Sequence, residues 1–433
     1  MRHWFRDRHF QSVLRNTGYL AASKAVAAVA GLATLAFAGR SLGLMMFGIL
    51  ILIVSYTKAA SGLSRFQSWQ LVVRYSGKVL VDGDPVQFKA ATGFALGLDL
   101  LSGFVGMILA IALLPLLGSW FGITDQYLNL AMLYCLLLPT MGGATANGVL
   151  RALDRFDLIS WQGTTYPIAR AILAGIAWTN GAGFETFVLI WFVTDLGGDL
   201  YMWFLAWREL KRRDLLSGIR PTLRPIGLPR AWNFAIHVNF NASLVAAWGP
   251  LARLVIGGLV GPAGAAIYRV ASSLADSAQK PSDMLAKTFY PEIVRMDLAS
   301  KKPWKLMLRG TALAAAIGLL FVGILLVAGK PLVDLLFGAE FLPAYDVLLI
   351  LIIAPLLAVI SFPLPSMLLA LDRPDGPVKA RLLGVVTYFA IVAPLAWRFG
   401  VEGAAGAFVI GNAVQVASLV WQVRTQHRLV RGV

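Results

Sequence analysis

The sequence predicts an all-α integral membrane protein of about twelve transmembrane helices, built as two parallel six-helix repeats (lobes) around a central cavity. Its 433 residues are 58% hydrophobic and only 14% charged, and the mean hydropathy is +0.72. A soluble chain of this length would need far more polar surface to cover its core. The apolar residues also come in long blocks, each near the ~20 residues that cross the hydrocarbon core as a helix.

These blocks define the expected spans in order along the chain. We expect them at residues 17–39, 44–73, 89–115, 127–150, 158–180, 184–206, 234–260, 263–289, 306–328, 344–369, 377–398 and 401–423.

The spans group into two lobes with connecting segments outside the membrane. The first six form an N-terminal lobe over residues 16–206, and the last six form a C-terminal lobe over residues 234–423. Residues 207–233 are basic and contain Pro221, Pro225 and Pro229, so we expect a cytoplasmic linker there. Residues 1–15 mix aromatic residues with arginines, which is typical of an interfacial segment on the cytoplasmic side. Residues 424–433 are expected to form a cytoplasmic tail.

The basic residues set the orientation of the spans. The net charge is +16, and the basic residues outside the spans cluster in every second connection. The intervening connections hold only Arg40, Lys330 and Arg398. Because cytoplasmic loops of membrane proteins carry the excess of Lys and Arg, both termini are predicted to be cytoplasmic. This placement explains the positive charge without a nucleic-acid partner.

The two lobes resemble each other in sequence. Ala152–Arg155 recurs as Ala370–Arg373, and the recurring prolines and glycines are Pro115 with Pro331, Pro139 with Pro355, Gly39 with Gly257, and Gly43 with Gly261. The offset is 216 residues for the prolines (331 − 115) and 218 for the other pairs (370 − 152). A nearly constant offset indicates an internal duplication. Since each copy holds an even number of spans, both lobes share one orientation in the membrane, which is a transporter architecture.

Basic residues inside the spans are candidate substrate-binding residues. Each costs at least about 2.5–3.5 kcal/mol at a helix centre, so it should face the bundle interior or water. Six are predicted to line a cationic cavity for an anionic substrate: Lys24, Lys58, Arg65, Arg253, Arg269 and Lys280. The alternative is that they pair between helices or reach the cytoplasmic surface. For Lys280 this alternative has a specific partner, since Asp276 lies four residues earlier on the same helix.

Three carboxylates inside the spans are candidates for ion coupling. They are Asp99, Asp195 and Asp199, and the last two lie one helical turn apart. Carboxylates near the middle of the membrane are what a proton or Na⁺ site needs. The alternative is that the three carboxylates only neutralise Lys24 and Arg170.

The sequence contains no pattern of a catalytic site. It has no Walker loop, its four histidines are scattered, and no His/Cys group has metal-ligand spacing. We therefore expect no enzyme activity, no catalytic residue, no cofactor and no metal site. The single cysteine, Cys135, lies inside an expected span and implies no disulfide framework.

Four groups of segments together resemble one family of membrane proteins. They are Phe37–Gly43 with Phe47 and Gly48, Arg253–Gly258 with Gly261–Pro262 and Ile267–Arg269, Phe337–Ala344 with Leu368–Ala370, and Gly400–Ala405. In this order they resemble the polysaccharide flippases, the O-antigen and exopolysaccharide translocases of the multidrug/oligosaccharidyl-lipid/polysaccharide exporter superfamily. The resemblance covers essentially the whole chain. One departure is Ala252, which stands where the family often has an acidic residue before the arginine.

The resemblance implies a function and a set of partners. The function is the flipping of polyprenyl-pyrophosphate-linked oligosaccharide repeat units across the bacterial inner membrane by alternating access, for surface polysaccharides such as the O-antigen of lipopolysaccharide. The implied partners are this lipid-linked oligosaccharide, membrane lipid, H⁺ or Na⁺ as coupling ion, and polysaccharide polymerase or export proteins. In related flippases, basic residues of the first, second and eighth spans line the cavity, and Lys24, Lys58, Arg65 and Arg269 stand on those spans here.

Two alternatives stay open at the level of sequence. A drug/cation antiporter of the same superfamily would prefer an acidic cavity, and the excess of Lys and Arg inside the spans counts against it. A membrane glycosyltransferase or polymerase would need acidic residues on sizeable external loops, and the expected external loops are short.

Overall fold

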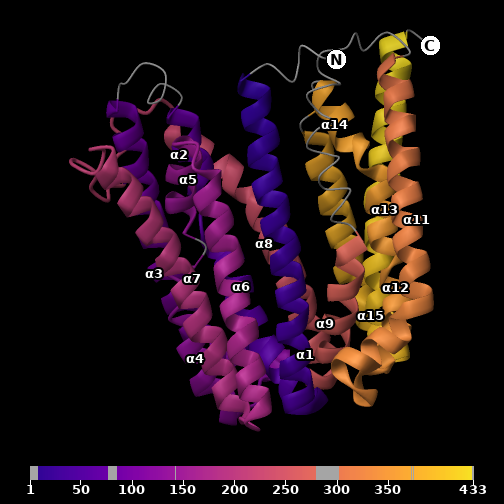
Figure 1. The fold of residues 1–433 in the computed structure, drawn as a ribbon. Helices are drawn as coiled ribbons and strands as arrows, with labels where there is room; N and C mark the ends of the chain where they lie inside the picture. The colour runs from indigo at the N-terminus through magenta and orange to yellow at the C-terminus, as the bar shows by residue number, and fades with distance from the viewer. Residues whose placement is uncertain are drawn as a thin grey trace. The chain divides into compact units, whose positions relative to one another are not determined.

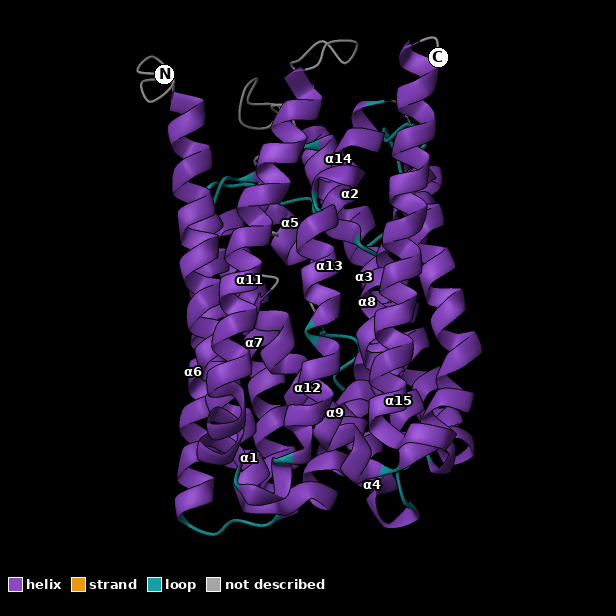
Figure 2. Cartoon of the chain, turned by 90° about the vertical axis from the view of Figure 1, so that its right-hand side faces the viewer, coloured by secondary structure: helices purple, strands orange, loops and turns teal. Residues whose placement is uncertain are grey.

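The computed structural model describes residues 8–76, 85–141, 143–278, 302–371, 373 and 375–431. All regular secondary structure within these residues is helical, as the purple ribbons of Figure 2 show. Six of the described helices are long and apolar enough to cross a membrane, and two of them, Ala22–Ser64 and Asp375–Gln426, are 43 and 52 residues long. Since about 20 residues cross the hydrocarbon core, each of these two holds a pair of spans. With the broken and shorter helices below, the predicted all-α protein of about twelve spans is confirmed.

The first three spans come from α1 to α3. Helix α1 (Arg8–Ser64) has one non-helical residue, Gly43 (φ 66°, ψ 177°), which divides it into the first and second spans. Glycine adopts a positive φ without the steric cost of a side chain. After Ser64 the chain turns and continues as α2 (Ser68–Tyr75), and α3 (Val86–Leu117) forms the third span.

The fourth span is broken near its middle. Two short 3₁₀ turns, η2 (Ser119–Phe121) and η3 (Asp125–Tyr127), lead into α4 (Leu128–Cys135). The chain then makes tight turns around Pro139 before α5 (Ala144–Ala152) begins. Proline has no N–H to donate and clashes with the preceding turn of a helix, which explains the break. The fifth and sixth spans are α6 (Phe156–Thr179) and α7 (Phe184–Arg212).

The second half of the chain follows the same plan. Its described elements are α8 (Ala231–Val260), α9 (Pro262–Ala275), η4 (Asp276–Ala278), α11 (Lys302–Phe337), η5 (Ala339–Phe341), α12 (Pro343–Leu351), α13 (Ile353–Ser361), α14 (Pro363–Ala370) and α15 (Asp375–Arg431). The tenth span is therefore in three pieces, α12 to α14, which follow one another in orange in Figure 1. Helix α15 holds the last two spans and is divided at Gly400 (φ 61°).

Local backbone geometry recurs at the offset that the sequence indicates. At the ends of α5 and α14, the N–H groups of Arg155 and Arg373 donate to carbonyl groups five residues earlier, at 2.8 and 2.9 Å. Gly43 and Gly261 share a positive φ (66° and 90°) with an extended ψ (177° and 173°), each where one span gives way to the next. Equivalent positions thus have equivalent conformations, which confirms the internal repeat.

The chain divides into two compact units. Unit 1 contains Met1–Leu42 and Ile49–Leu254, and unit 2 contains Gly43–Gly48 and Val255–Val433. Most of α8 packs within unit 1, where Leu228, Ala231 and Ala235 join a buried cluster with Leu71 of α2 and Phe94 of α3. The lobe boundaries expected from the sequence, 16–206 and 234–423, stay a prediction.

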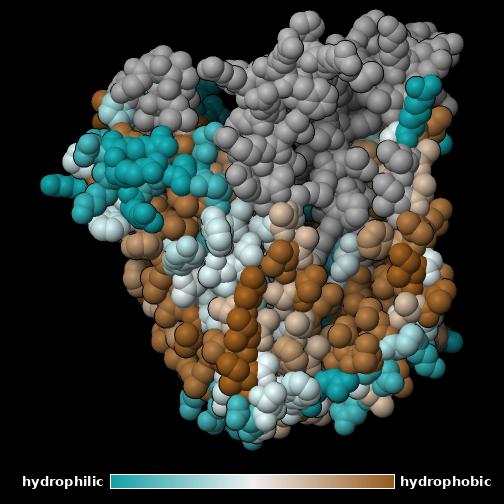
Figure 3. All heavy atoms as spheres, in the orientation of Figure 1, coloured by the Kyte–Doolittle hydropathy of each residue, from teal (hydrophilic) through white to brown (hydrophobic). Residues whose placement is uncertain are grey.

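The basic segment after α7, residues 213–230, packs along α3 instead of running free. The N–H of Thr222 donates to the C=O of Gly93 (3.1 Å). A Cβ atom at Gly97 would lie 2.4 Å from the carbonyl oxygen of Thr222, so only glycine allows this approach. Figure 3 shows hydrophilic atoms over this segment and a hydrophobic band below it over α3. This contrast is that of a helix that crosses lipid and ends in water.

Candidate functional site

The break in the fourth span leaves backbone groups without helical partners, and two charged side chains satisfy them. Arg65, which follows α1, donates from Nη1 to the C=O of Leu138 inside the break (3.4 Å). Asp99 on α3 accepts the N–H of Thr145 in the first turn of α5 (2.9 Å). An unsatisfied backbone group inside a membrane is costly, because no water is present to pair with it. Arg65 and Asp99 therefore stabilise the broken segment.

Asp99 is the centre of a buried hydrogen-bonded cluster. Its carboxylate also accepts the hydroxyl groups of Ser68 (2.5 Å) and Thr145 (2.8 Å). Nη2 of Arg65 lies 3.9 Å from Oδ2 of Asp99, and the two side chains are only 6% and 2% exposed. The carboxylate is thus paired with a cation and held by three hydrogen bonds, which is what a buried charge requires.

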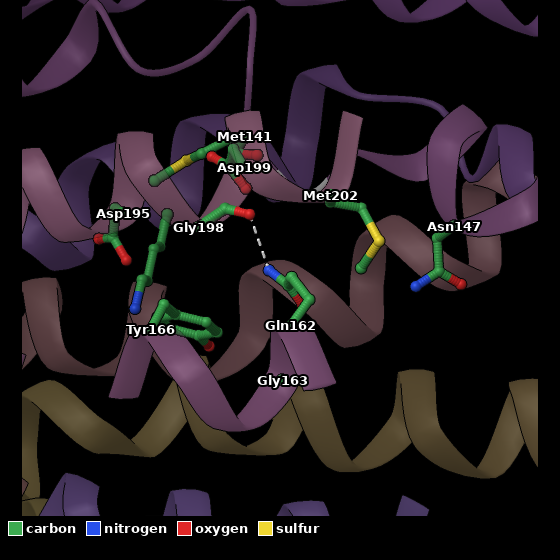
Figure 4. A pocket seen from close by; sticks show the side chains of 11 residues that line it. Met141, Asn147, Gln162, Gly163, Tyr166, Asp195, Gly198, Asp199 and Met202 are labelled. Carbon is green, nitrogen blue, oxygen red and sulfur yellow. Dashed lines mark hydrogen bonds between the residues drawn. The ribbon is translucent and has the colours of Figure 1, made fainter. Parts of the chain in front are cut away.

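A cavity of about 410 Å³ in unit 1 is lined by residues of α1, α5, α6 and α7, and we call it the acidic chamber. Its polar lining residues are Lys58, Ser61, Asn147, Gln162, Tyr166, Asp195 and Asp199. Figure 4 shows Asp195 and Asp199 from α7 facing Tyr166 and Gln162 from α6. Nε2 of Gln162 donates to the C=O of Gly198 (2.9 Å), the dashed line of Figure 4, and so ties α6 to α7.

The two carboxylates of the acidic chamber have different surroundings. Asp195 forms an ion pair with Arg170 of α6 and accepts the hydroxyl of Tyr134 of α4. Arg170 also donates from Nε to Oγ1 of Thr194 (2.7 Å). The sequence left open whether one of the three carboxylates neutralises Arg170. In the structure Asp195 does so. Asp199 lines the same chamber one turn further along α7.

A second cavity in unit 1, of about 450 Å³, is the basic chamber. Its lining includes the cations Lys58, Arg65 and Arg151, and no carboxylate lines it among the residues that the structure describes. Arg151 of α5 donates from Nε to Oδ1 of Asn147 (2.5 Å), and its guanidinium lies 4.6 Å from the ring centre of Trp69. These contacts hold the guanidinium by a hydrogen bond and a cation–π interaction.

The two chambers share four lining residues, which are Lys58, Ser61, Met141 and Asn147. Lys58 is exposed to the cavity space and lies within range of the Asp195 charge. A lysine side chain thus stands where the acidic and the basic chamber meet.

The other predicted site residues lie elsewhere. Lys24 is exposed on α1, and Arg253 of α8 donates from Nε to Oγ of Ser55 (2.9 Å). Arg269 is half-buried on α9, in unit 2. Lys280 lies outside the described residues. The structure thus brings Lys58 together with Asp195 and Asp199 in one chamber, and with Arg65 in the other.

Sequence reasoning missed several residues of these chambers. Arg151 lies just past the expected span 127–150, and Trp69 lies inside an expected span without a charge. The same holds for Tyr134, which contacts Asp195 of the acidic chamber. One available signal was the short apolar run around Pro139, because a broken span needs polar side chains from its neighbours.

Comparison with known proteins agrees with this architecture. No family model matches the chain. The inner membrane protein YghQ of Escherichia coli (strain K12) is 40% identical over 351 residues, which cover 80% of this chain and 99% of that protein.

Solved structures share the fold at low sequence identity. A multidrug resistance MATE family transporter of the MOP superfamily, in an inward-facing conformation, has a TM-score of 0.70 at 16% identity and covers 95% of this chain and 96% of its own. The lipid II flippase MurJ, in an inward closed conformation, has a TM-score of 0.63 at 12% identity, with coverage of 95% and 89%. The chain therefore has the fold of MOP-superfamily proteins and belongs to the family of the inner membrane protein YghQ.

Proposed function

We propose that this protein is a membrane transporter that flips polyprenyl-pyrophosphate-linked oligosaccharide repeat units across the bacterial inner membrane for surface polysaccharide biosynthesis. The observation that carries the proposal is the basic chamber, where Lys58, Arg65 and Arg151 come together. Lysine and arginine side chains that converge on one cavity inside a bundle of membrane helices form a suitable site for an anion, and no carboxylate lines this cavity among the described residues. The fold shared with the lipid II flippase MurJ supports the same proposal.

The chemistry of such a cargo suits the chamber. A pyrophosphate diester carries two negative charges and several oxygen acceptors, which arginine binds through its planar fork of donors. Charge attraction is stronger in a cavity than in bulk water, since the effective dielectric constant is lower. The polyprenyl tail stays in lipid, so the protein needs to enclose only the polar head.

The remaining charged residues have proposed roles in the same cycle. Asp195 and Asp199 are the proposed site of the coupling ion, H⁺ or Na⁺, because the two carboxylates line one cavity inside the helix bundle. Lys24, Arg253, Arg269 and Lys280 stay predicted as further cations for the cargo. Asp99, which was predicted to join the coupling site, is instead proposed to support the break in the fourth span.

A drug/cation antiporter is the second candidate, and the acidic chamber favours it. Asp195 and Asp199 could hold an organic cation beside the aromatic ring of Tyr166. The MATE transporter with the same fold is a multidrug resistance protein.

One experiment separates the two candidates. Deletion of the gene should cause lipid-linked oligosaccharide to accumulate on the cytoplasmic side, and a plasmid copy of the parent gene should reverse it. An Arg151→Ala copy should fail while it is produced at the parent level, and an Arg74→Ala copy, altered outside both chambers, should succeed. If deletion leaves lipid-linked oligosaccharides unchanged but increases sensitivity to organic cations, the antiporter is the better assignment.

A further inference from the structure

The basic segment after α7 is held against unit 1 at three points. The N–H of Thr222 donates to the C=O of Gly93 on α3 (3.1 Å), and Tyr75 at the end of α2 donates its hydroxyl to the C=O of Pro229 (2.6 Å). Leu228 is buried in the cluster that α2 and α3 form with the start of α8. The backbone of this segment therefore has a fixed place beside α3, and that place decides what its outward side chains contact.

The basic segment crosses α3 at the border between a covered and an exposed part of that helix. Residues 91–99 of α3 are all buried or half-buried. Beyond them the outer face of the helix is apolar and exposed at Leu100, Leu101, Phe104, Val105, Ile108 and Leu109. Gly97, which Thr222 approaches, precedes Leu100 by about 5 Å along the helix axis. Figure 3 shows the same border between hydrophilic and hydrophobic atoms. Since lipid tails cover an exposed apolar face of a spanning helix, the segment lies at the height of the head groups.

Two arginines and two apolar residues of the segment are exposed at this height. Arg220 and Arg224 are exposed, and their guanidinium groups have no ion pair or hydrogen bond within the described part of the chain. Leu223 is 42% exposed and Ile226 is 75% exposed. Residues 215–230 contain no acidic residue that could balance the arginines. Basic side chains beside exposed apolar ones are typical of a segment in the membrane interface, where the charges reach phosphates and the apolar groups enter the tail region.

We propose that residues 220–226 form a docking surface for anionic phospholipids. Arg220 and Arg224 bind the phosphate groups, and Leu223 and Ile226 contact the upper part of the acyl chains. Arginine suits this role because its planar fork of donors matches the oxygens of a phosphate. An anionic head group is favoured over a zwitterionic one, since a quaternary ammonium next to the phosphate cancels the charge that attracts the arginines. The proposal involves neither chamber, so it holds for either candidate function.

The surface has features that the orientation of the chain does not require. The rule that orients membrane proteins requires only that the segment be basic. It does not require a fixed backbone, a position beside the exposed face of α3, or apolar side chains exposed between the arginines. A lipid-docking surface uses all three. Because the backbone is already held at Thr222 and Pro229, binding of a lipid orders only side chains, and little affinity is lost to ordering.

The test uses the full-length protein in phosphatidylcholine nanodiscs with a small share of a photoactivatable phospholipid, whose reactive group lies in the acyl chain near the head group. The probe is either a phosphatidylglycerol or a phosphatidylcholine analogue. After illumination, mass spectrometry measures the lipid attached within residues 215–230. In the parent, the phosphatidylglycerol analogue should attach there roughly ten- to thirtyfold more than the phosphatidylcholine analogue, as expected for two basic side chains near an anionic surface. Attachment to residues 100–109 of α3 should show no such preference and serves as the internal control.

Paired substitutions separate the contributions of charge and apolar contact. Arg220→Gln with Arg224→Gln should remove the preference for phosphatidylglycerol and leave attachment of the phosphatidylcholine analogue unchanged. Lysine at both positions should keep most of the preference, because the charge remains. Leu223→Ser with Ile226→Ser should reduce attachment of both analogues. All four side chains are exposed, so each variant should unfold at the temperature of the parent.

A matched variant controls for the loss of two positive charges. Lys330→Gln with Arg398→Gln alters two exposed cations of unit 2 and should match the parent within residues 215–230. The inference is overturned if the parent attaches both analogues equally at this segment, or if the glutamine variant keeps the preference of the parent. It is also overturned if lipid attaches to residues 100–109 but not to residues 215–230, because the segment would then face water or another protein.

Discussion

The guanidinium of Arg65 and the carboxylate of Asp99, 3.9 Å apart at their closest atoms, satisfy opposite ends of the same break in the fourth span. Arg65 donates to the carbonyl of Leu138, and Asp99 accepts the N–H of Thr145 where the helix resumes. Arg65 lies in the turn after α1 and Asp99 lies on α3, so two segments far apart in the sequence support this break. These contacts indicate that Arg65 and Asp99 stabilise the broken span. In this role Asp99 differs from Asp195 and Asp199, the two carboxylates of the acidic chamber.

Removal of the Asp99 carboxylate is expected to destabilise the protein. Asp99→Ala leaves Arg65 buried without its counterion and Thr145 without an acceptor for its N–H. Loss of one partner of a buried ion pair typically costs about 3–5 kcal/mol. Thermal unfolding in detergent should show this as a lower midpoint, whereas Asp125→Ala, altered at an exposed carboxylate before α4, should unfold close to the parent. If Asp99→Ala is as stable as the parent but does not transport, Asp99 belongs to the coupling site after all.

Neutral substitutions in the acidic chamber are expected to abolish coupling and spare cargo binding. Asp195→Asn and Asp199→Asn should each fail to complement a deletion strain while the purified proteins still bind a symmetrical dialkyl pyrophosphate, a soluble probe for the head group of the cargo. Asp195→Asn should also be less stable than Asp199→Asn, because Arg170 loses its counterion. Normal complementation by both variants would place the coupling ion elsewhere and leave Asp195 as a partner of Arg170 alone.

Substitution of Arg151 by lysine tests whether the basic chamber needs a guanidinium or only a charge. If the guanidinium binds phosphate oxygens in a bidentate way, Arg151→Lys should weaken binding of the dialkyl pyrophosphate nearly as much as Arg151→Ala, by roughly tenfold or more. Arg74→Lys is the matched control, since Arg74 also lies over an aromatic ring, 4.3 Å from the centre of Phe234, but outside both chambers. Full binding by Arg151→Lys would show that charge alone is sufficient.

Cysteine labelling tests the predicted orientation of the chain. Ser217 lies in the basic segment after α7 and Gly183 in the turn before α7, and both are exposed. A Cβ atom at Gly183 meets nothing within 4 Å, so a cysteine fits there without strain. In intact cells, a membrane-impermeant reagent should label Gly183→Cys and not Ser217→Cys, both in a Cys135→Ala background. The reverse pattern would invert the topology and the direction of transport with it.

The ion pair at the turn between α5 and α6 predicts a small pH dependence of stability. Two hydrogen bonds from the Arg155 guanidinium, at 2.9 and 2.7 Å, lower the pKa of Asp157. A carboxyl with a lowered folded-state pKa contributes stability above its ordinary pKa of about 3.9, and this contribution is lost as the pH falls through the folded-state value. Asp157→Asn should therefore be slightly less stable than the parent at neutral pH, and the difference in melting temperature should shrink below about pH 4. A constant difference across this range would contradict the assignment.

Much of the fold could be predicted because membranes impose simple rules. Long apolar blocks give spans of helix, since every backbone group in lipid needs an internal partner. The repeat was visible because glycines and prolines recur at a nearly constant offset, and Gly43 and Gly261 also share a backbone conformation. In the sequence, the break shows only as Pro139 inside an expected span. The side chains that satisfy it, Arg65 and Asp99, come from other segments, so the sequence could not assign them to it.

The sequence by itself determined that this is a helical membrane protein of two similar halves, with Lys58, Arg65, Asp195 and Asp199 as charged residues inside it. The tertiary structure decided how those charges are shared. It placed Asp99 with Arg65 at the helix break, Asp195 with Arg170, and Lys58 between two chambers. These pairings join residues on different helices, and their energies depend on distances that only the packing of the helices sets.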